Sequence, residues 1–584
     1  MRRRIQQVGR QLVERHTSLL VFAVATLVYL LTMDRSASWW DCGEFIATGY
    51  GLQVGHPPGA PTYQLITHLF MLLSFGHAGW VAPLSNLVSV LCGGLTVMLL
   101  YRTILLLSRK ASRLGAGCGA GCYLFCDTAW FSAVESEVYS MAMLVCALAV
   151  WLMLRWEREG GGRKLLLTAL TLGLGVGVHL MTLLVTPALL WLFIRRMRRC
   201  RGAWPLPALR VMPLCLVFFL LGLTTYAVIP IRAASNPPIN EGNPATVERF
   251  RAYVGRDQYP KAPLYPRLWR ERDRDHWQSW GATDEGLWSN TKYYFSYQLG
   301  YMYCRYIMYN FIGRENLRWH LPVLSVLPFL LGLWGIVAQW KRRQRGRLLT
   351  VALLFLFGGI ILNLYLNHPC YEPRERDYAY VLSFYAFAIW IGIGAGDVRE
   401  RFAGHRKRTL ATAVLVAAPL LLAAGNWSDH DRHNCHSVHD ISLNHLQSCD
   451  HGAILLTLGD NDTFPLWYLQ HVEHRRTDVS VYNINLVGFR RTMEILEAND
   501  FRRPVYLSHY LYRQYGRFFG AGLRCEGFCW RVLPQAEADS SDNAALRRHI
   551  NDSIEWNITP GEYMDHISRS FLSIWKENTG DQVQ

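Results

Sequence analysis

Long apolar runs recur along most of this chain of 584 residues, and they constrain its fold more than any other feature. Each run is about as long as a bilayer is thick when it is built as a helix. The runs predict about 11 transmembrane helices, at residues 17–33, 81–107, 114–131, 138–154, two within 165–194, 211–229, 321–340, 348–366, 379–395 and 409–425. We therefore expect a mainly α-helical, polytopic membrane protein.

The formal net charge of +16 comes from basic residues in short segments between the apolar runs. In a soluble protein this charge would suggest nucleic-acid binding, but here the positive-inside rule accounts for it. Alternating the sides places the N-terminus in the cytoplasm and the C-terminus outside. Residues 61–75 are apolar but short, so we expect an interfacial or half-crossing helix there. No small-residue cleavage site precedes Asp34, which favours a retained first helix over a cleaved signal peptide.

The composition changes to that of a soluble protein near residue 426, which divides the chain into two expected domains. Residues 1–425 should form the membrane domain, with a first outer loop around Asp41 and a long outer region at 233–319. Residues 426–584 should form an α/β domain outside the cytoplasm.

The segment AILLTLGDNDTFPLWYLQ predicts a buried strand, an acidic turn and a helix in the second domain. Asp460 and Asp462 of the turn could bind a cation, or could simply form the turn and cap the helix. An oxidising compartment would permit disulfides among Cys435, Cys449, Cys525 and Cys529. The sequence does not give their pairing, and no Cys or His cluster has the spacing of a structural zinc site.

The most unusual polar feature is an acidic pair in SWWDCGEF, directly after the first apolar run. Between Arg35 and Arg102 no Lys or Arg is present to neutralise Asp41 and Glu44. Apolar and aromatic neighbours would partly desolvate the pair, raise its proton affinity and suit it to general-base work. The alternative is a helix N-cap beside a solvated acid. We predict Asp41 and Glu44 as catalytic residues.

Three further residues are expected to bind substrate on the same side. His56, in the turn VGHPPGAP, could hydrogen-bond a substrate hydroxyl or phosphate, although a rigid bend alone could explain this turn. Glu135 and Glu137, in WFSAVESEVYS, occupy a turn too short to hide them from the outer face. Their alternative role is a polar cap that closes a helix hairpin.

Cationic side chains near the ends of other spans could hold a phosphate. In YEPRERDYAY, Arg374 and Arg376 are placed to bind a lipid phosphate bidentately, and the alternative is anchoring by salt bridges at the interface. Arg232 is a weaker candidate for the same task. His179, in the apolar run GVGVHLM, could contact substrate or could be a packed, hydrogen-bonded histidine.

Together these residues place a carboxylate base and a cationic phosphate clamp at one membrane surface. Transfer of a sugar from a lipid phosphate needs both groups, because the attacking hydroxyl loses a proton and the departing phosphate gains charge. We expect no metal and no further cofactor. Two alternatives stay open: a transporter or flippase for a lipid-linked glycan, and an assembly subunit without activity. A transporter would place its charges near the bilayer midplane.

Four motifs in this order, WWDCGEF, GHPPGAPTY, AVESEVYS and PRERDY, resemble a polytopic membrane family long catalogued as of unknown function. A eukaryotic relative in that family is an endoplasmic-reticulum protein O-mannosyltransferase, and the family resembles the GT-C glycosyltransferases. Those enzymes use polyprenyl-phosphate sugars and carry an acidic residue in the first outer loop, a position that Asp41 matches.

The resemblance implies a GT-C-like fold and an inverting glycosyltransferase of the cytoplasmic (inner) membrane, active on its periplasmic face. Mannose is the favoured sugar, the donor is a polyprenyl phosphate, and the acceptor is Ser or Thr of exported proteins. Transfer to a lipid or polysaccharide acceptor is the alternative.

Overall fold

A computed structural model describes most of the chain, namely residues 2–108, 112–199, 206–314, 323–372, 374–402, 404–519 and 522–533. The last part of the predicted second domain, residues 534–584, lies outside the described residues. So does the end of the predicted outer region, residues 315–319.

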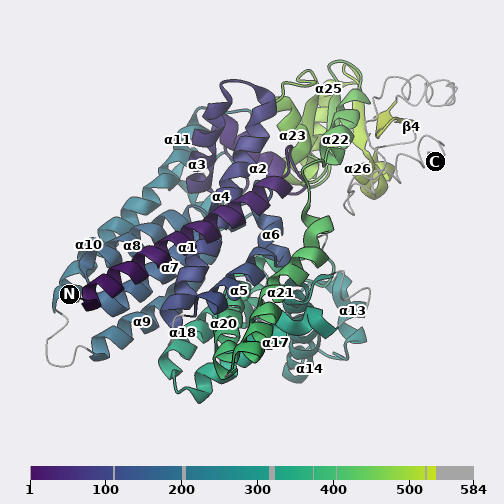
Figure 1. The fold of residues 1–584 in the computed structure, drawn as a ribbon. Helices are drawn as coiled ribbons and strands as arrows, with labels where there is room; N and C mark the ends of the chain where they lie inside the picture. The colour runs from purple at the N-terminus through teal and green to yellow at the C-terminus, as the bar shows by residue number, and fades with distance from the viewer. Residues whose placement is uncertain are drawn as a thin grey trace.

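The first part of the described chain is a succession of helices (Figure 1). They are α1 (Arg2–Thr32), α2 (Cys42–Gly51), α3 (Pro61–Met71), η1 (Leu72–Ser74), α4 (Ala78–Leu107), α5 (Arg113–Leu124), α6 (Asp127–Ala133), α7 (Val138–Glu159), α8 (Gly162–Val176), η2 (Leu180–Val185) and α9 (Thr186–Arg199).

The helical part continues to residue 430. Its elements are α10 (Leu206–Leu223), η3 (Thr224–Ala227), α11 (Val228–Ala234), α12 (Val247–Gly255), η4 (Glu271–Asp273), α13 (Arg274–Ser279), α14 (Leu287–Tyr293), η5 (Tyr294–Tyr303), α15 (Cys304–Phe311), η6 (Val323–Val326), α17 (Leu327–Lys341), α18 (Arg345–Phe355), η7 (Leu356–Ile360), α19 (Ile361–Leu366), η8 (Asp377–Tyr380), α20 (Val381–Arg401) and α21 (His405–His430).

Eight helical runs among the described residues are long and apolar enough to cross a membrane, which supports a multi-pass membrane protein. They are Val13–Thr32, Ala78–Leu107, Val138–Glu159, Leu180–Arg199, Arg210–Ala234, Arg345–Leu366, Asp377–Arg401 and Arg406–His430. Each coincides with one of the spans predicted from the sequence. The full number of spans stays a prediction.

The other predicted spans are shorter helices. The run at 114–131 is divided into α5 and α6, and the run at 321–340 gives the short α17 after η6. The run at 165–194 forms two helices, α8 and the continuous η2–α9, with His179 at the bend between them. The predicted pair of short helices is therefore confirmed. Residues 61–71 form the short helix expected before the second span.

The basic segments between spans meet at one end of the bundle, which we call the basic end. Arg347, in the first turn of α18, donates to the carbonyl of Leu107 at the end of α4. Arg195 of α9 donates to the carbonyl of Gly346, and Arg342 after α17 pairs with Asp397 of α20. The ends of five helices are thus held together there. This grouping agrees with the alternation of sides that the charge pattern predicts.

After residue 430 the chain forms a mixed sheet covered by helices. The elements are α22 (Ser437–Gln447), β1 (Ile454–Thr457), α23 (Phe464–His471), β2 (Ser480–Asn483), α24 (Ile484–Val487), α25 (Phe489–Asn499), β3 (Val505–Ser508), α26 (His509–Tyr515), η9 (Gly516–Phe518), β4 (Leu523–Glu526) and β5 (Cys529–Val532). The strand order is β2-β1-β3-β5-β4, with β1 parallel to β2 and β3, and the other two pairs antiparallel. The predicted strand, acidic turn and helix are confirmed in β1, the loop after it and α23.

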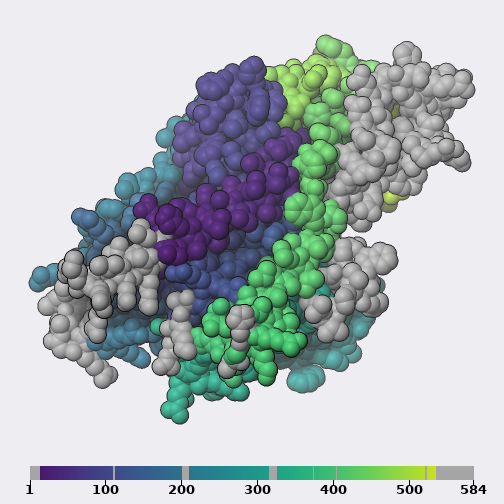
Figure 2. All heavy atoms as spheres, viewed as in Figure 1, coloured from purple at the N-terminus to yellow at the C-terminus, as the bar shows by residue number. Residues whose placement is uncertain are grey.

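The C-terminal domain lies at the end of the bundle opposite the N-terminus, beside α2 and α3 (Figure 1). Figure 2 shows α21 running along the surface of the bundle up to this domain. The two parts share one apolar core, because Cys42, Ile46 and Ala47 of α2 pack with residues of the sheet and α23. The residues of the sheet and α23 in this core include Leu455, Leu466, Leu469 and Tyr506. We call this end of the bundle the site end.

Candidate functional site

Asp41 takes the N-cap position of α2, but its side chain makes no capping hydrogen bond. Its backbone is helical, with φ −78° and ψ −6°, instead of the extended conformation that orients a capping side chain. The capping alternative is therefore wrong for this aspartate. The half-buried carboxylate is left available to a substrate.

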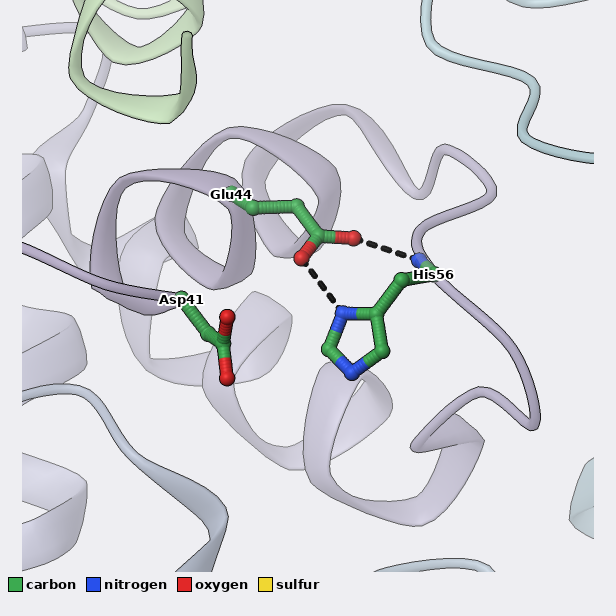
Figure 3. A group of neighbouring side chains, drawn as sticks. All are labelled: Asp41, Glu44 and His56. Atoms are coloured by element: carbon green, nitrogen blue, oxygen red, sulfur yellow. Dashed lines mark hydrogen bonds and ion pairs between the residues drawn. The ribbon is translucent and has the colours of Figure 1, made fainter. Parts of the chain in front are cut away.

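Glu44, one turn further along α2, is bound to His56 through both carboxylate oxygens (Figure 3). The backbone N–H of His56 donates to Oε1 at 2.5 Å, and Nδ1 donates to Oε2 at 2.6 Å. The Glu44 side chain is 1% exposed and that of His56 is 28% exposed, so only the histidine can meet a ligand. Glu44 thus positions His56. A Cβ at Gly55 would collide with Oε1 of Glu44, so a glycine is needed here.

This pair fixes the charge of His56. Burial alone would lower the pKa of His56, but the carboxylate of Glu44 outweighs burial and holds the pKa well above its ordinary 6.5. Asp41 adds to the same effect. His56 is therefore a cation at neutral pH, and its Nε2 edge lies away from Glu44 (Figure 3).

Asp41, Glu44 and His56 form a compact group, with one potential ligand atom of each within 4.8 Å of the others. A metal ion needs several such ligand atoms close together, and among the described residues these three side chains are arranged closely enough to hold one. Both oxygens of Glu44 already accept hydrogen bonds from His56, however. This occupancy favours a carboxylate–imidazolium pair beside a free aspartate.

Glu135 and Glu137 are buried, with their side chains 1% exposed, so the prediction that they face the surface is wrong. Arg374 reaches them from the loop before η8, with Nη1 at 3.2 Å from Glu137 Oε1. Arg432 also binds Glu135, at 2.9 Å. Burial raises the pKa of Glu137 to about 8, Arg374 opposes that shift and the charge of Asp41 adds to it. Asp41 therefore lies close to this second acidic pair.

A cavity of about 870 Å³ opens beside Glu135 and Arg374. Arginines and aromatic rings dominate its wall: Arg305, Arg314, Arg374, Arg376, Arg432, Trp39, Trp40, Trp280, Tyr297, Tyr301, Tyr306, Tyr371 and Tyr378. Guanidinium groups suit a phosphate, and aromatic faces suit an apolar or sugar ring. Sequence reasoning missed most of this wall, although the aromatic density of residues 293–311 could have indicated it.

The two arginines of PRERDY differ in their freedom. Arg374 is 12% exposed and lies over the rings of Trp40, Phe131 and Tyr378. Arg376 is 32% exposed and pairs with Glu372 at 2.6 Å. Arg376 is thus the more accessible of the two, and Arg374 mainly neutralises the buried glutamates.

Two predicted site residues have structural partners outside the cavity. Arg232 donates from Nε to the carbonyl of Leu52 and from Nη2 to that of Gly51, so it caps the end of α2. His179 accepts a hydrogen bond from the backbone N–H of Met181 at 3.1 Å. These contacts match the alternative given for His179, and substrate roles for both residues stay predictions.

The two aspartates in the acidic turn after β1 have different surroundings. Asp462 is buried and accepts from the N–H of Leu458 and the hydroxyl of Ser508, as a turn-forming residue does. Asp460 is exposed, and its charge acts on the Asp41 group. The two carboxylates therefore do not form a joint cation site. The four candidate disulfide cysteines are buried in the structure.

Sequence reasoning also missed Glu241, which had no motif to mark it. Its side chain is buried, and neither carboxylate oxygen has a hydrogen-bond partner among the described residues. Burial raises its pKa well above the ordinary 4.5, and the charges of Glu44 and Asp41 act in the same direction. Glu241 therefore belongs to the acidic surroundings of His56.

The fold and this site define a helical membrane protein with a carboxylate, an imidazolium and an arginine-rich cavity at one end of its bundle. Residues 41–201 match the family model described as Protein O-mannosyl-transferase TMEM260 N-terminal domain, and residues 438–490 match TMEM260-associated domain 2. The chain is thus related to the TMEM260 O-mannosyltransferases, as its motifs predict, and Asp41 is the first residue of the larger match.

Two named relatives extend the similarity over most of the chain. The mouse (Mus musculus) protein O-mannosyl-transferase TMEM260 is 28% identical over 496 residues, covering 81% of this chain and 63% of the relative. The Dictyostelium discoideum protein O-mannosyl-transferase tmem260 is 22% identical over 510 residues, with coverages of 80% and 57%. The chain therefore spans about three fifths of the length of these relatives.

Solved structures show more distant likenesses. A crystal structure of the Archaeoglobus fulgidus oligosaccharyltransferase with Zn and sulfate has a TM-score of 0.47 and 12% identity, covering 85% of this chain and 69% of that one. The Mycobacterium smegmatis arabinosyltransferase EmbB has a TM-score of 0.34 and 14% identity, covering 79% and 40%.

Proposed function

We propose that this chain is an inverting membrane glycosyltransferase of GT-C type. It moves a sugar, with mannose favoured, from a polyprenyl-phosphate donor to a hydroxyl acceptor, in the first place Ser or Thr of exported proteins. The observation that carries the proposal is the uncapped carboxylate of Asp41, which lies beside the Glu44–His56 pair and directly follows Trp40, a residue that lines the arginine-rich cavity. The names of the mouse and Dictyostelium relatives support the same activity.

In the proposed reaction, Asp41 accepts the proton of the acceptor hydroxyl as its oxygen attacks the anomeric carbon. The bond between that carbon and the phosphate oxygen breaks, and the electron pair leaves with the phosphate. Arg376 and the His56 imidazolium are accessible cations on this side of the bundle, and they stabilise the charge that develops on the phosphate. Neither step requires a metal or a further cofactor.

The proposed orientation follows from the charges at the two ends of the bundle. The basic end faces the cytoplasm, and the site end and the C-terminal domain face the periplasm at the inner membrane. The cavity can then receive a lipid-linked donor from the outer leaflet.

The proposal is tested with purified protein in liposomes that contain labelled polyprenyl-phosphate mannose and a Ser/Thr peptide. We expect label on the peptide, and none when nucleotide-linked mannose replaces the lipid donor. A panel of other lipid-linked sugars and of lipid or polysaccharide acceptors identifies the substrates. Movement of the donor across the bilayer without any new glycosidic bond would favour a flippase instead.

A further inference from the structure

The loop between β1 and α23 crosses from the C-terminal domain to the residue before Asp41. Asn461 of this loop accepts a hydrogen bond from the backbone N–H of Trp40, with 2.6 Å between nitrogen and Oδ1. The two residues are 421 positions apart. A side chain of the second domain thus holds the backbone at the proposed catalytic aspartate.

Trp40 needs such a restraint. Its φ of 63° lies in the left-handed region, which a bulky residue adopts only when its surroundings enforce it. Asn461 holds the amide, and the guanidinium of Arg374 lies over the indole ring at 5.3 Å from its centroid. The conformation of Trp40 therefore depends on both domains. Because Trp40 directly precedes Asp41, this conformation helps to set the direction of the Asp41 side chain.

The helices on either side of this contact are packed too closely to slide. A Cβ at Gly43 of α2 would lie 2.6 Å from the carbonyl oxygen of Phe464, the first residue of α23. α2 and α23 lie side by side at the site end (Figure 1). Because their apolar faces share one core, the loop that carries Asn461 has a fixed place relative to α2.

We infer that Asn461 is a positioning residue for Asp41, and that the C-terminal domain completes the catalytic site. The inference rests on the proposed function. Asp460, the residue before Asn461, brings its charge to the same place, where it acts together with Asp41, Glu44 and His56. Asp460 and Asn461 of this turn therefore lie beside the site.

The test compares Asn461→Ala with Asn499→Ala. Asn499 lies in the same domain and is nearly buried, and among the described residues its side chain hydrogen-bonds to the backbone of Arg503 in that domain. We expect Asn461→Ala to lower kcat by about 10-fold to 100-fold, because a displacement of ~1 Å has that effect on a catalytic group. KM for the lipid donor should stay unchanged. Asn499→Ala should keep kcat even where its Tm falls.

Asn461→Asp supplies the rescue, since its carboxylate can accept the Trp40 N–H from the same position. It should restore most of kcat, because it keeps the acceptor oxygen that Asn461→Ala removes. Rescue of kcat by the residue that keeps the acceptor oxygen, with KM for the donor unchanged, is the signature of a positioning hydrogen bond. Unchanged kcat in Asn461→Ala, or an equal loss in Asn499→Ala, would overturn the inference.

Hydrogen exchange of the peptide containing Trp40 separates this inference from the proposed function. Asn461→Ala should speed exchange at the Trp40 amide, and Asn499→Ala should not, whether or not the protein transfers sugar. If exchange is unaltered, Asn461 does not hold this backbone. If exchange changes as expected but the wild type transfers no sugar from any donor, the contact stands and the glycosyltransferase proposal fails.

Discussion

At the scale of single residues, the site separates a free acid from a paired one. Asp41 has no capping bond, whereas both oxygens of Glu44 are bound to His56. Two acids three positions apart on the chain therefore have different tasks. Asp41 can accept a proton, and Glu44 keeps a neighbouring imidazole charged and oriented.

The first prediction concerns the charge of His56. In Glu44→Gln the carboxylate that raises the pKa is gone, so burial should leave the pKa of His56 below 6.5. NMR titration of labelled histidine should find His56 protonated at neutral pH in the wild type and neutral in the variant. Glu494→Gln is the control, because Glu494 is an exposed residue of α25 that pairs with Arg491. An unchanged titration in Glu44→Gln would contradict the assignment.

The Glu44–His56 pair also determines how the free energy of unfolding depends on pH. The folded pKa of His56 lies above the unfolded value, so the stabilisation is complete below about pH 6.5. It is lost as pH rises through the folded pKa.

The sequence predicts part of this residue-level picture. Asp41, Glu44 and His56 lie within one short segment, so their proximity could be predicted from local motifs. The pairing of Arg374 with Glu137 could not, because the partners are 237 positions apart and meet only through the packing of helices. The charge pattern predicted Arg374 near the site, but not that it is occupied by buried glutamates.

At the scale of elements, α2 is the part that positions the site, and both of its ends are held from outside. Asn461 holds the backbone before α2, and Arg232 binds the carbonyls of Gly51 and Leu52 at its other end. A cation at a helix C-terminus also interacts favourably with the helix dipole. We therefore interpret Arg232 as a support of α2.

The second prediction separates this role from phosphate binding. Arg232→Gln should lower the free energy of unfolding by about 0.5–1.5 kcal/mol, with little change in KM for the lipid donor. Arg376→Gln should raise that KM about tenfold, which corresponds to one lost charge-assisted hydrogen bond of ~1.5 kcal/mol. Thermal melts and steady-state kinetics measure the two effects. A raised donor KM in Arg232→Gln with an unchanged Tm would restore Arg232 as a phosphate ligand.

At the scale of the whole molecule, hydropathy and charge predict the order of the parts well. Eight predicted spans coincide with long helices, and the change of composition at residue 426 marks the end of the helical part within a few residues. The docking of α23 on α2 could not be predicted, since it depends on a core made from residues of both domains.

The third prediction concerns orientation. In a background where the exposed Cys304 is Ser, a cysteine at Asp284 should react with a membrane-impermeant maleimide in intact spheroplasts. A cysteine at Arg345, beside the basic end, should react only after permeabilisation. The opposite pattern would reverse the proposed topology and place the site in the cytoplasm.

The central claim is that Asp41 is the proton acceptor in sugar transfer, and the initial rate of Asp41→Asn tests it most directly. Asp450→Asn is the matched control, because Asp450 is 52% exposed in the C-terminal domain and pairs there with Arg531. With labelled polyprenyl-phosphate mannose and a Ser/Thr peptide, Asp41→Asn should lose about 100-fold or more of the wild-type rate, and Asp450→Asn should keep it. Equal rates in wild type and a folded Asp41→Asn would contradict the account.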